Sequence, residues 1–118
     1  MATIRQHNYY VYFLTNKNRT VLYVGVTNDL QRRLTEHYLG AQKPPRRVFT
    51  ARYNCYYCIG YEHFIWIQQA KAREKEIKKW RKEKKMGRVR ELNPEGKFLN
   101  DEILGVGWEE RYRWKDEQ

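Results

Sequence analysis

Two short segments, residues 9–15 and 20–26, constrain the fold of this chain more than any other feature. Both are rich in aromatic and β-branched residues, a composition that favours β-strands. The polar residues 16–19 between them are typical of a hairpin loop. The sequence therefore predicts an antiparallel hairpin near the N-terminus.

The expected register of this hairpin brings tyrosines together. Pairing the last residue of the first segment with the first residue of the second places Tyr12 opposite Tyr23. Tyr10 then lies opposite Gly25. Because side chains two residues apart share a face of a sheet, we expect three phenols to converge over a glycine that leaves room for another group. Aromatic cross-strand pairs also serve stability alone, and that interpretation stays open here.

The chain is strongly basic, with 24 Lys and Arg against 14 Asp and Glu and a formal net charge of +10. Its 118 residues suit one domain with a modest core. The charge favours a polyanionic partner, and nucleic acid is the first candidate because 15% of the residues are aromatic. A basic protein without such a partner is the alternative.

Neither a membrane nor a zinc ion is expected as a partner. No apolar run approaches the roughly 20 residues that span a bilayer, and residues 1–8 lack the apolar stretch of a signal peptide, which predicts a cytoplasmic protein. Cys55 and Cys58 form a Cys-x-x-Cys pair, but a closed zinc site takes four ligands and there is no second pair. Their odd spacing in a strand would place the thiols on opposite faces, so we predict two ordinary reduced cysteines.

A helix is expected directly after the hairpin. Asn28 followed by Gln31 resembles a capping box. The helix would reach about Tyr38, with Leu30, Leu34 and Tyr38 as its buried stripe.

The later elements follow from turn and periodicity signals: a loop over 40–45, a third strand within 48–61 and mainly in 55–61, a helix over about 66–84, and a short helix around Gly87. Three antiparallel strands flanked by helices give an α+β fold. For residues 97–118, periodicity does not decide between a packed appendage and a loose tail.

Polar residues at buried positions are the candidates for chemistry. Arg33 and His37 are four residues apart and therefore neighbours on one helix face. Arg33 falls at the edge of the buried stripe, whereas Arg32 points to solvent. Arg33 is thus placed to reach inward with His37 beside it, and an ordinary solvated position is the alternative for each.

Glu74 lies in the apolar stripe of the long helix, between Ala70 and Ile77. A buried carboxylate is costly unless it is paired or binds a cation. A salt bridge with Arg33 is one explanation. Coordination of a divalent cation is the other, because Mg²⁺ is typically held by one or two carboxylates together with waters and phosphate oxygens.

These residues suit phosphodiester hydrolysis. A metal at Glu74 would polarise the phosphate, and Arg33 would neutralise the charge that develops on its oxygens. A tyrosine would position or deprotonate the attacking water, and with an ordinary pKa of about 10 it needs an acceptor such as His37. The hypothesis requires the phenols, Arg33 and Glu74 to surround one cavity.

Three stretches resemble the GIY-YIG endonuclease domain: Tyr10-Val11-Tyr12, the run from Tyr23-Val24-Gly25 to His37, and residues 72–80 around Glu74. The chain looks most like the small proteins of that superfamily related to the catalytic domain of the excinuclease C subunit. Its first motif reads Tyr-Val-Tyr in place of Gly-Ile-Tyr, which keeps the tyrosine. The resemblance implies a three-stranded sheet flanked by helices, a nuclease-like domain over 1–96, and a C-terminal extension over 97–118.

The resemblance also implies a role for each matched residue. The catalytic group would be Tyr12 as general base or water-positioning residue, Tyr23 beside it, Arg33 as the transition-state arginine, His37 one helical turn later, and Glu74 as the metal ligand; Tyr10, Gly25 and Asn93 would support the site. The implied activity is a Mg²⁺- or Mn²⁺-dependent DNA endonuclease of low sequence specificity, in repair or mobile-DNA processing, with RNA as an open alternative substrate.

Basic residues of the long helix would bind phosphates: Lys71, Lys75, Lys78, Lys79, Arg81 and Lys82. The rival hypothesis is a non-catalytic nucleic-acid-binding module on the same scaffold.

Overall fold

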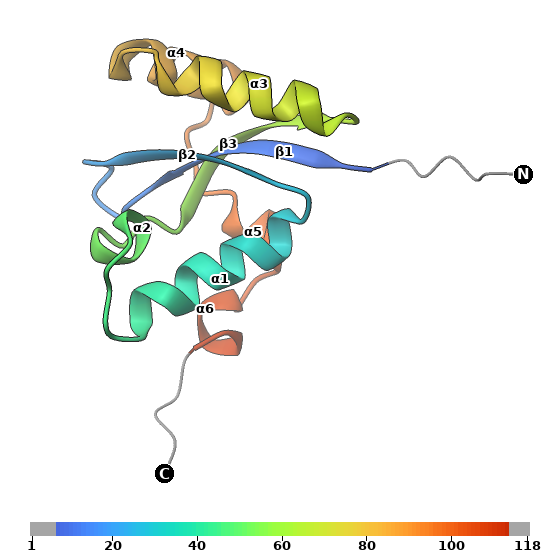
Figure 1. Ribbon diagram of the computed structural model, residues 1–118. Helices are drawn as coiled ribbons and strands as arrows, with labels where there is room; N and C mark the ends of the chain where they lie inside the picture. The colour runs from blue at the N-terminus through green and yellow to red at the C-terminus, as the bar shows by residue number, and fades with distance from the viewer. Residues whose placement is uncertain (1–6, 114–118) are drawn as a thin grey trace, which may run out of the picture.

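The computed structural model describes residues 7–113, which fold into a three-stranded antiparallel sheet with helices on both faces (Figure 1). The strands are β1 (Tyr9–Thr15), β2 (Leu22–Thr27) and β3 (Tyr57–Phe64), in the order β2-β1-β3. The helices are α1 (Leu30–Gln42), α2 (Phe49–Arg52), α3 (Ile67–Lys78), α4 (Lys82–Leu92), α5 (Asn100–Leu104) and α6 (Trp108–Arg111). The predicted α+β class is confirmed.

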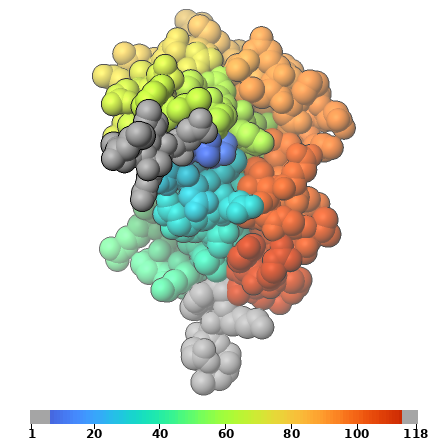
Figure 2. Space-filling view, turned by 90° about the vertical axis from the view of Figure 1, so that its right-hand side faces the viewer, coloured from blue at the N-terminus to red at the C-terminus, as the bar shows by residue number. Residues whose placement is uncertain are grey.

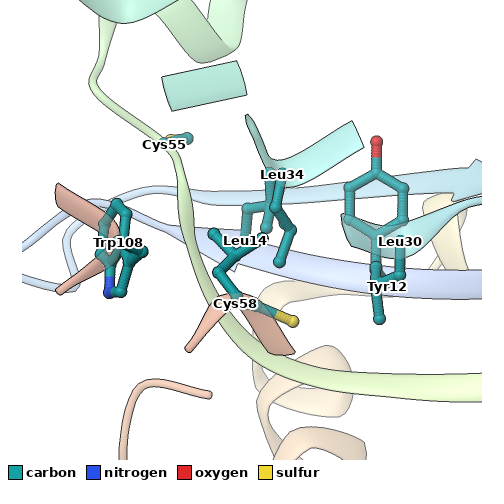
Figure 3. Packing of buried hydrophobic residues seen from close by; sticks show 8 residues of the cluster. Tyr12, Leu14, Leu30, Leu34, Cys55, Cys58 and Trp108 are labelled. Atoms are coloured by element: carbon teal, nitrogen blue, oxygen red, sulfur yellow. The ribbon is translucent and has the colours of Figure 1, made fainter. Parts of the chain in front are cut away.

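The two faces of the sheet carry separate cores because side chains alternate along each strand. Tyr12 and Leu14 of β1 pack with Leu30 on the face that α1, α5 and α6 cover (Figure 3). Val11 and Phe13 pack on the other face, under α3 and α4. The edge strand β2 borders both layers, so α1 and α3 lie on opposite sides of the same open edge.

The hairpin register differs from the predicted one by two residues. Thr15 pairs with Leu22 and not with Thr20. The cause is Asn16, whose Oδ1 accepts hydrogen bonds from the backbone N–H groups of Thr20 at 2.8 Å and Val21 at 3.2 Å. Both residues therefore belong to the loop. Because a shift of two preserves the alternation, every strand residue keeps its predicted face.

Helix α1 starts later and ends later than predicted. Its N-cap is Asp29 and not Asn28, because the Asp29 side chain accepts a hydrogen bond from the Arg32 backbone N–H at 3.0 Å. Gln31 donates to a carbonyl of α5 instead of closing a capping box. The helix continues through Gly40 to Gln42 and ends before the prolines at 44 and 45.

The long helix expected over 66–84 is two helices. α3 ends at Lys78 and α4 begins at Lys82. This turn lets both helices reach the same acid on β3, because Arg73 of α3 and Arg88 of α4 donate hydrogen bonds to Glu62 at 2.8 and 2.6 Å. Although burial opposes ionisation, the two guanidinium groups hold the pKa of Glu62 below its ordinary value. The charged pairs fasten α3 and α4 to the sheet.

The third strand comes later than predicted because residues 49–52 form α2. Cys55 precedes the strand, so the alternation rule does not apply to it, and both thiols lie in the α1-side core (Figure 3). The prediction of opposite faces is wrong. Both cysteines are free, and burial raises the pKa of Cys55 to about 11 and that of Cys58 to about 12.

Residues 97–113 pack against α1 and β3, beside the cyan helix in Figure 2. Asn100 accepts a hydrogen bond from the Cys58 N–H at 2.7 Å and donates to the Tyr56 carbonyl at 2.8 Å. Trp108 is buried in the same core. Of the two alternatives left open by the sequence, residues 97–113 therefore form a packed appendage. Residues 114–118 lie outside the described residues. No helix within the described part of the chain is long and apolar enough to cross a bilayer.

Candidate active site

Tyr12 stands directly over Gly25, its partner on β2. A Cβ at position 25 would lie 2.5 Å from Tyr12 Oη and 2.9 Å from Tyr23 Cε2. The predicted pairs Tyr12–Tyr23 and Tyr10–Gly25 are therefore wrong, and the space above the glycine holds the Tyr12 phenol itself. Gly25 is required by this close approach and not by its backbone, which has no positive φ.

Tyr10 shares the face of Tyr12 but packs toward β3. Its ring centroid lies 5.8 Å from that of Tyr61 and 5.2 Å from that of His63. The expected convergence of three phenols is therefore reduced to two, Tyr12 and Tyr23, whose ring centroids are 6.2 Å apart.

His37 joins the phenols from α1. It is buried, with Nε2 2.9 Å from Tyr12 Oη and Nδ1 3.1 Å from Thr50 Oγ1 of α2. Burial, assisted by the charge of Arg33, lowers the pKa of His37 to about 4. The imidazole is therefore neutral at pH 7, and a neutral ring can accept the Tyr12 proton at Nε2 while it donates from Nδ1 to Thr50. A solvated position for His37 is excluded.

Tyr12 itself is a neutral phenol in this setting. Burial raises its pKa, and the neighbouring Tyr23 adds to the rise, while the charge of Arg33 opposes it. Only 1% of the Tyr12 surface is exposed. Removal of its proton therefore depends on the acceptor to which it is bonded, His37.

The two arginines of α1 differ as predicted. The Arg32 side chain is 54% exposed and forms ion pairs with Asp29 and Glu36. The Arg33 side chain is 38% exposed, pairs with Glu36 at 3.0 Å, and acts electrostatically on Tyr12. Arg33 is thus the arginine that lies beside the phenols.

Glu74 lies on α3 between Ala70 and Ile77, which pack on the face of the sheet opposite to Tyr12. Its side chain is 21% exposed, and its carboxylate forms an ion pair with Lys78 at 3.3 Å. Within residues 7–113 the salt bridge with Arg33 considered from the sequence is not formed. Glu74 and the phenols therefore approach the open edge of β2 from different sides.

A pocket of about 450 Å³ opens at this edge, between α1 and α3. Arg33 lines it from α1 and Lys71 lines it from α3, one helical turn before Glu74. The complete lining is Tyr9, Val26, Thr27, Asn28, Arg32, Arg33, Glu36, Ile67 and Lys71. The phenols and Glu74 do not line it, so the expectation of one cavity surrounded by all of them is wrong. Hydrolysis therefore loses the support that required this shared cavity.

The residues near the pocket fit a divalent cation only in part. Among residues 7–113, no three His, Cys, Asp or Glu side chains converge as a protein-built metal site would need. Mg²⁺ often keeps several waters and takes one or two carboxylates together with substrate phosphates. The partly exposed carboxylate of Glu74 fits that kind of site, in which the substrate completes the coordination.

Asn93 lies away from the phenols. It is buried at the end of α4, and its Nδ2 donates to the carbonyls of Ile59 at 3.1 Å and Lys97 at 2.7 Å. These bonds hold the turn after α4 against β3, which is the other edge of the sheet.

Two polar residues with structural importance escape prediction from the sequence. Thr50, which holds His37, sits on the four-residue helix α2, where no periodicity can be read. Glu62 is held by arginines from two different helices, a tertiary contact for which the sequence carries no local signal.

The α1 side of the sheet thus brings together two tyrosines, a buried histidine and an arginine in an α+β domain. The model of the GIY-YIG catalytic domain matches residues 8–87, and the chain belongs to the GIY-YIG family. The resemblance seen in the sequence is thereby confirmed. Proteins with this domain are endonucleases that generally use a divalent metal. Searches of curated proteins and of solved structures gave no match.

Proposed function

We propose that the protein is a Mg²⁺- or Mn²⁺-dependent endonuclease that hydrolyses DNA phosphodiester bonds with low sequence specificity, in repair or mobile-DNA processing. Family membership supports the reaction class. The observation that carries the proposal for this chain is the buried hydrogen-bonded chain of Tyr12, His37 and Thr50 beside Arg33.

Tyr12 and His37 handle the proton in this proposal. The attacking water gives its proton to Tyr12 Oη while the Tyr12 proton moves to Nε2 of His37, so one hydroxide equivalent is released toward phosphorus. Because Tyr12 is buried, the phosphate would meet the more exposed Tyr23 and Arg33, and the attacking water would have to enter past them to reach Tyr12. Thr50 keeps the imidazole oriented.

Arg33 and Lys71 supply positive charge to the phosphate from the two sides of the β2 edge. Bound to Glu74, a Mg²⁺ or Mn²⁺ would polarise the phosphate and stabilise the leaving oxygen. The phosphate would therefore lie in this pocket, across the edge strand β2, whose Val26 and Thr27 line it between the two helices.

Exposed basic residues of α3, of the turn after it and of the start of α4 would hold the flanking backbone: Lys71, Lys75, Lys78, Lys79, Arg81 and Lys82. Each phosphate contact adds about 0.9 to the slope of binding against salt for duplex DNA. The same helices would also serve a module that binds without cleaving, so catalysis has to be tested apart from binding.

Plasmid nicking tests the proposal. Tyr12→Phe, Arg33→Lys and Glu74→Gln should each lower the Mg²⁺-dependent nicking rate by about 100-fold or more, since each removes a proton-transfer or charge-stabilising group. Arg90→Lys, at an exposed arginine of α4 that does not line the pocket, is the control and should leave the rate near that of the native chain. DNA binding, measured without metal, should change little in all four.

Two results would count against it. If Glu74→Gln nicked plasmid at the native rate, the Glu74 carboxylate would not be a ligand of the metal. No nicking by the native chain with Mg²⁺ or Mn²⁺, together with intact DNA binding, would identify the non-catalytic module instead. Matched RNA substrates in the same assay decide between the two nucleic acids.

A further inference from the structure

The connection between α1 and β3 carries positive charge without any acid. Residues 37–61 contain no Asp or Glu. Within them, the segment 43–53 holds four cations: Lys43, Arg46, Arg47 and Arg52. All four are exposed, and the ion pairs formed within residues 7–113 include none of them. The 43–53 segment is therefore an uncompensated basic surface, unlike Arg32 and Arg33 nearby.

The same segment exposes two aromatic rings. Phe49 is 45% exposed and Tyr53 is 44% exposed, and their ring centroids are 4.9 Å apart. Large exposed aromatic side chains among cations are the combination that binds single-stranded nucleic acid, in which cations follow the phosphates and rings stack on bases.

These rings continue into the proposed active site. Phe49 stacks on Tyr23, with centroids 6.3 Å apart and planes inclined by 24°. Tyr23 in turn meets His37 edge-on, with centroids 5.7 Å apart. Thr50, the next residue of α2, is buried and bonded to His37. The short helix thus supports the site with its inner side and presents Phe49 outward.

We propose that the 43–53 segment binds single-stranded nucleic acid next to the scissile phosphate, with unpaired bases stacked on Phe49 and Tyr53. Bases in a duplex keep their faces inside the stack, so only an unpaired base gains from these rings. The placement beside the scissile bond rests on the proposed nuclease function, whereas the binding does not. The substrate class that follows is a nucleic acid with an unpaired stretch at the cleavage point, such as a flap or a junction with a single-stranded arm.

Fluorescence anisotropy in EDTA tests this, with a labelled single strand and the blunt duplex of the same strand. Phe49→Leu/Tyr53→Leu keeps apolar bulk but removes both rings. It should weaken single-strand binding by about 5- to 100-fold, the range for the loss of base stacking, and leave duplex binding within about 2-fold. Tyr53 does not contact Tyr23, so Tyr53→Leu alone leaves the active site untouched. It should also weaken binding to the single strand and not to the duplex, by a smaller factor than the double variant.

The cations are tested through salt dependence. Arg46→Ala/Arg47→Ala should reduce the slope of log K against log salt by about 1.4 on the single strand, for two lost phosphate contacts. Arg90→Ala/Lys97→Ala removes two exposed cations outside this segment and should leave that slope unchanged.

Three results would overturn the inference. Equal losses on single strand and duplex would show that the rings do not select unpaired bases. Unchanged single-strand binding in the ring and arginine variants would remove the segment from the interface. If the ring and arginine variants bound DNA as the native chain does but lost binding to phosphatidylserine vesicles, the segment would be a membrane-binding surface instead. Since the assay contains no metal, its failure is separate from a failure to nick plasmid.

Discussion

Two glycine-to-alanine substitutions should change stability in opposite directions. Gly25→Ala places a methyl group 2.5 Å from Tyr12 Oη and 2.6 Å from Tyr12 Cζ. Gly40→Ala, inside α1, places the same group where nothing lies within 4 Å. The two variants therefore share the chemical change and differ only in the surroundings of the new Cβ.

The size of the effect follows from what Tyr12 would have to give up. Non-bonded carbon atoms prefer about 3.5–4.0 Å, so the new contact is about 1 Å too short. The Tyr12 ring is buried and bonded to His37, and it cannot move without losing that bond. Overpacking costs about 1–3 kcal/mol and the hydrogen bond about 1 kcal/mol, while the gain in moving from glycine to alanine is about 0.4–1 kcal/mol. Gly25→Ala should thus lose about 1–3 kcal/mol, whereas Gly40→Ala should gain about 0.5–1 kcal/mol.

Urea unfolding followed by tryptophan fluorescence measures both free energies. Nicking by Gly25→Ala should fall as well, because displacement of Tyr12 breaks its contact with His37 under the proposed mechanism. If Gly25→Ala proves as stable as the native chain, the Tyr12 ring is not fixed over the glycine and the close packing of the two phenols is refuted.

Three further predictions concern buried polar groups. The pKa of His37 falls from 6.5 in the unfolded chain to about 4 in the folded protein. Its contribution to the free energy of unfolding is therefore fully present above pH 6.5 and is lost as the pH falls toward 4, by up to about 3 kcal/mol. Urea unfolding across this pH range should show that His37→Gln lacks this pH dependence. Glu62→Gln should lose about 1–3 kcal/mol in the same assay at pH 7, since hydrogen bonds from two guanidinium groups lose their charge, whereas the exposed control Glu83→Gln should stay within about 0.5 kcal/mol. Asn100→Ala should lower the melting temperature, because two buried backbone groups lose their partner at about 1–3 kcal/mol each, and no change in melting relative to Asn18→Ala would contradict the bonds seen here.

Local patterns predicted most of the fold. The alternation in β1 and β2 placed each side chain on its correct face, and the error in register left this intact because it was even. The register itself depended on Asn16, whose bonds to the loop backbone are a matter of geometry and not of pattern. The break between α3 and α4 falls in a stretch without glycine or proline, so local sequence signals did not reveal it.

The candidate site divides in the same way. Spacing along α1 correctly put Arg33 and His37 near the phenols, because four residues make one helical turn. Spacing along α3 correctly placed Glu74 at a partly buried position between Ala70 and Ile77, but it could not tell which face of the sheet α3 covers. The contact of Thr50 with His37 could not be predicted, since a single helical turn is too short to show a hydrophobic periodicity. The catalytic roles of these residues stay predictions until nicking is measured.

The C-terminal segment has a consequence for self-association. Leu99 N–H donates to the Cys58 carbonyl at 2.8 Å, and Asn100 occupies the neighbouring N–H of Cys58 and the carbonyl of Tyr56. The segment thereby covers the free edge of β3. Without it, unpaired backbone N–H and C=O groups on this edge would be available to pair with a strand of another molecule. A chain truncated after residue 96 would leave this edge of β3 uncovered, and such a chain would be prone to polymerise through β3.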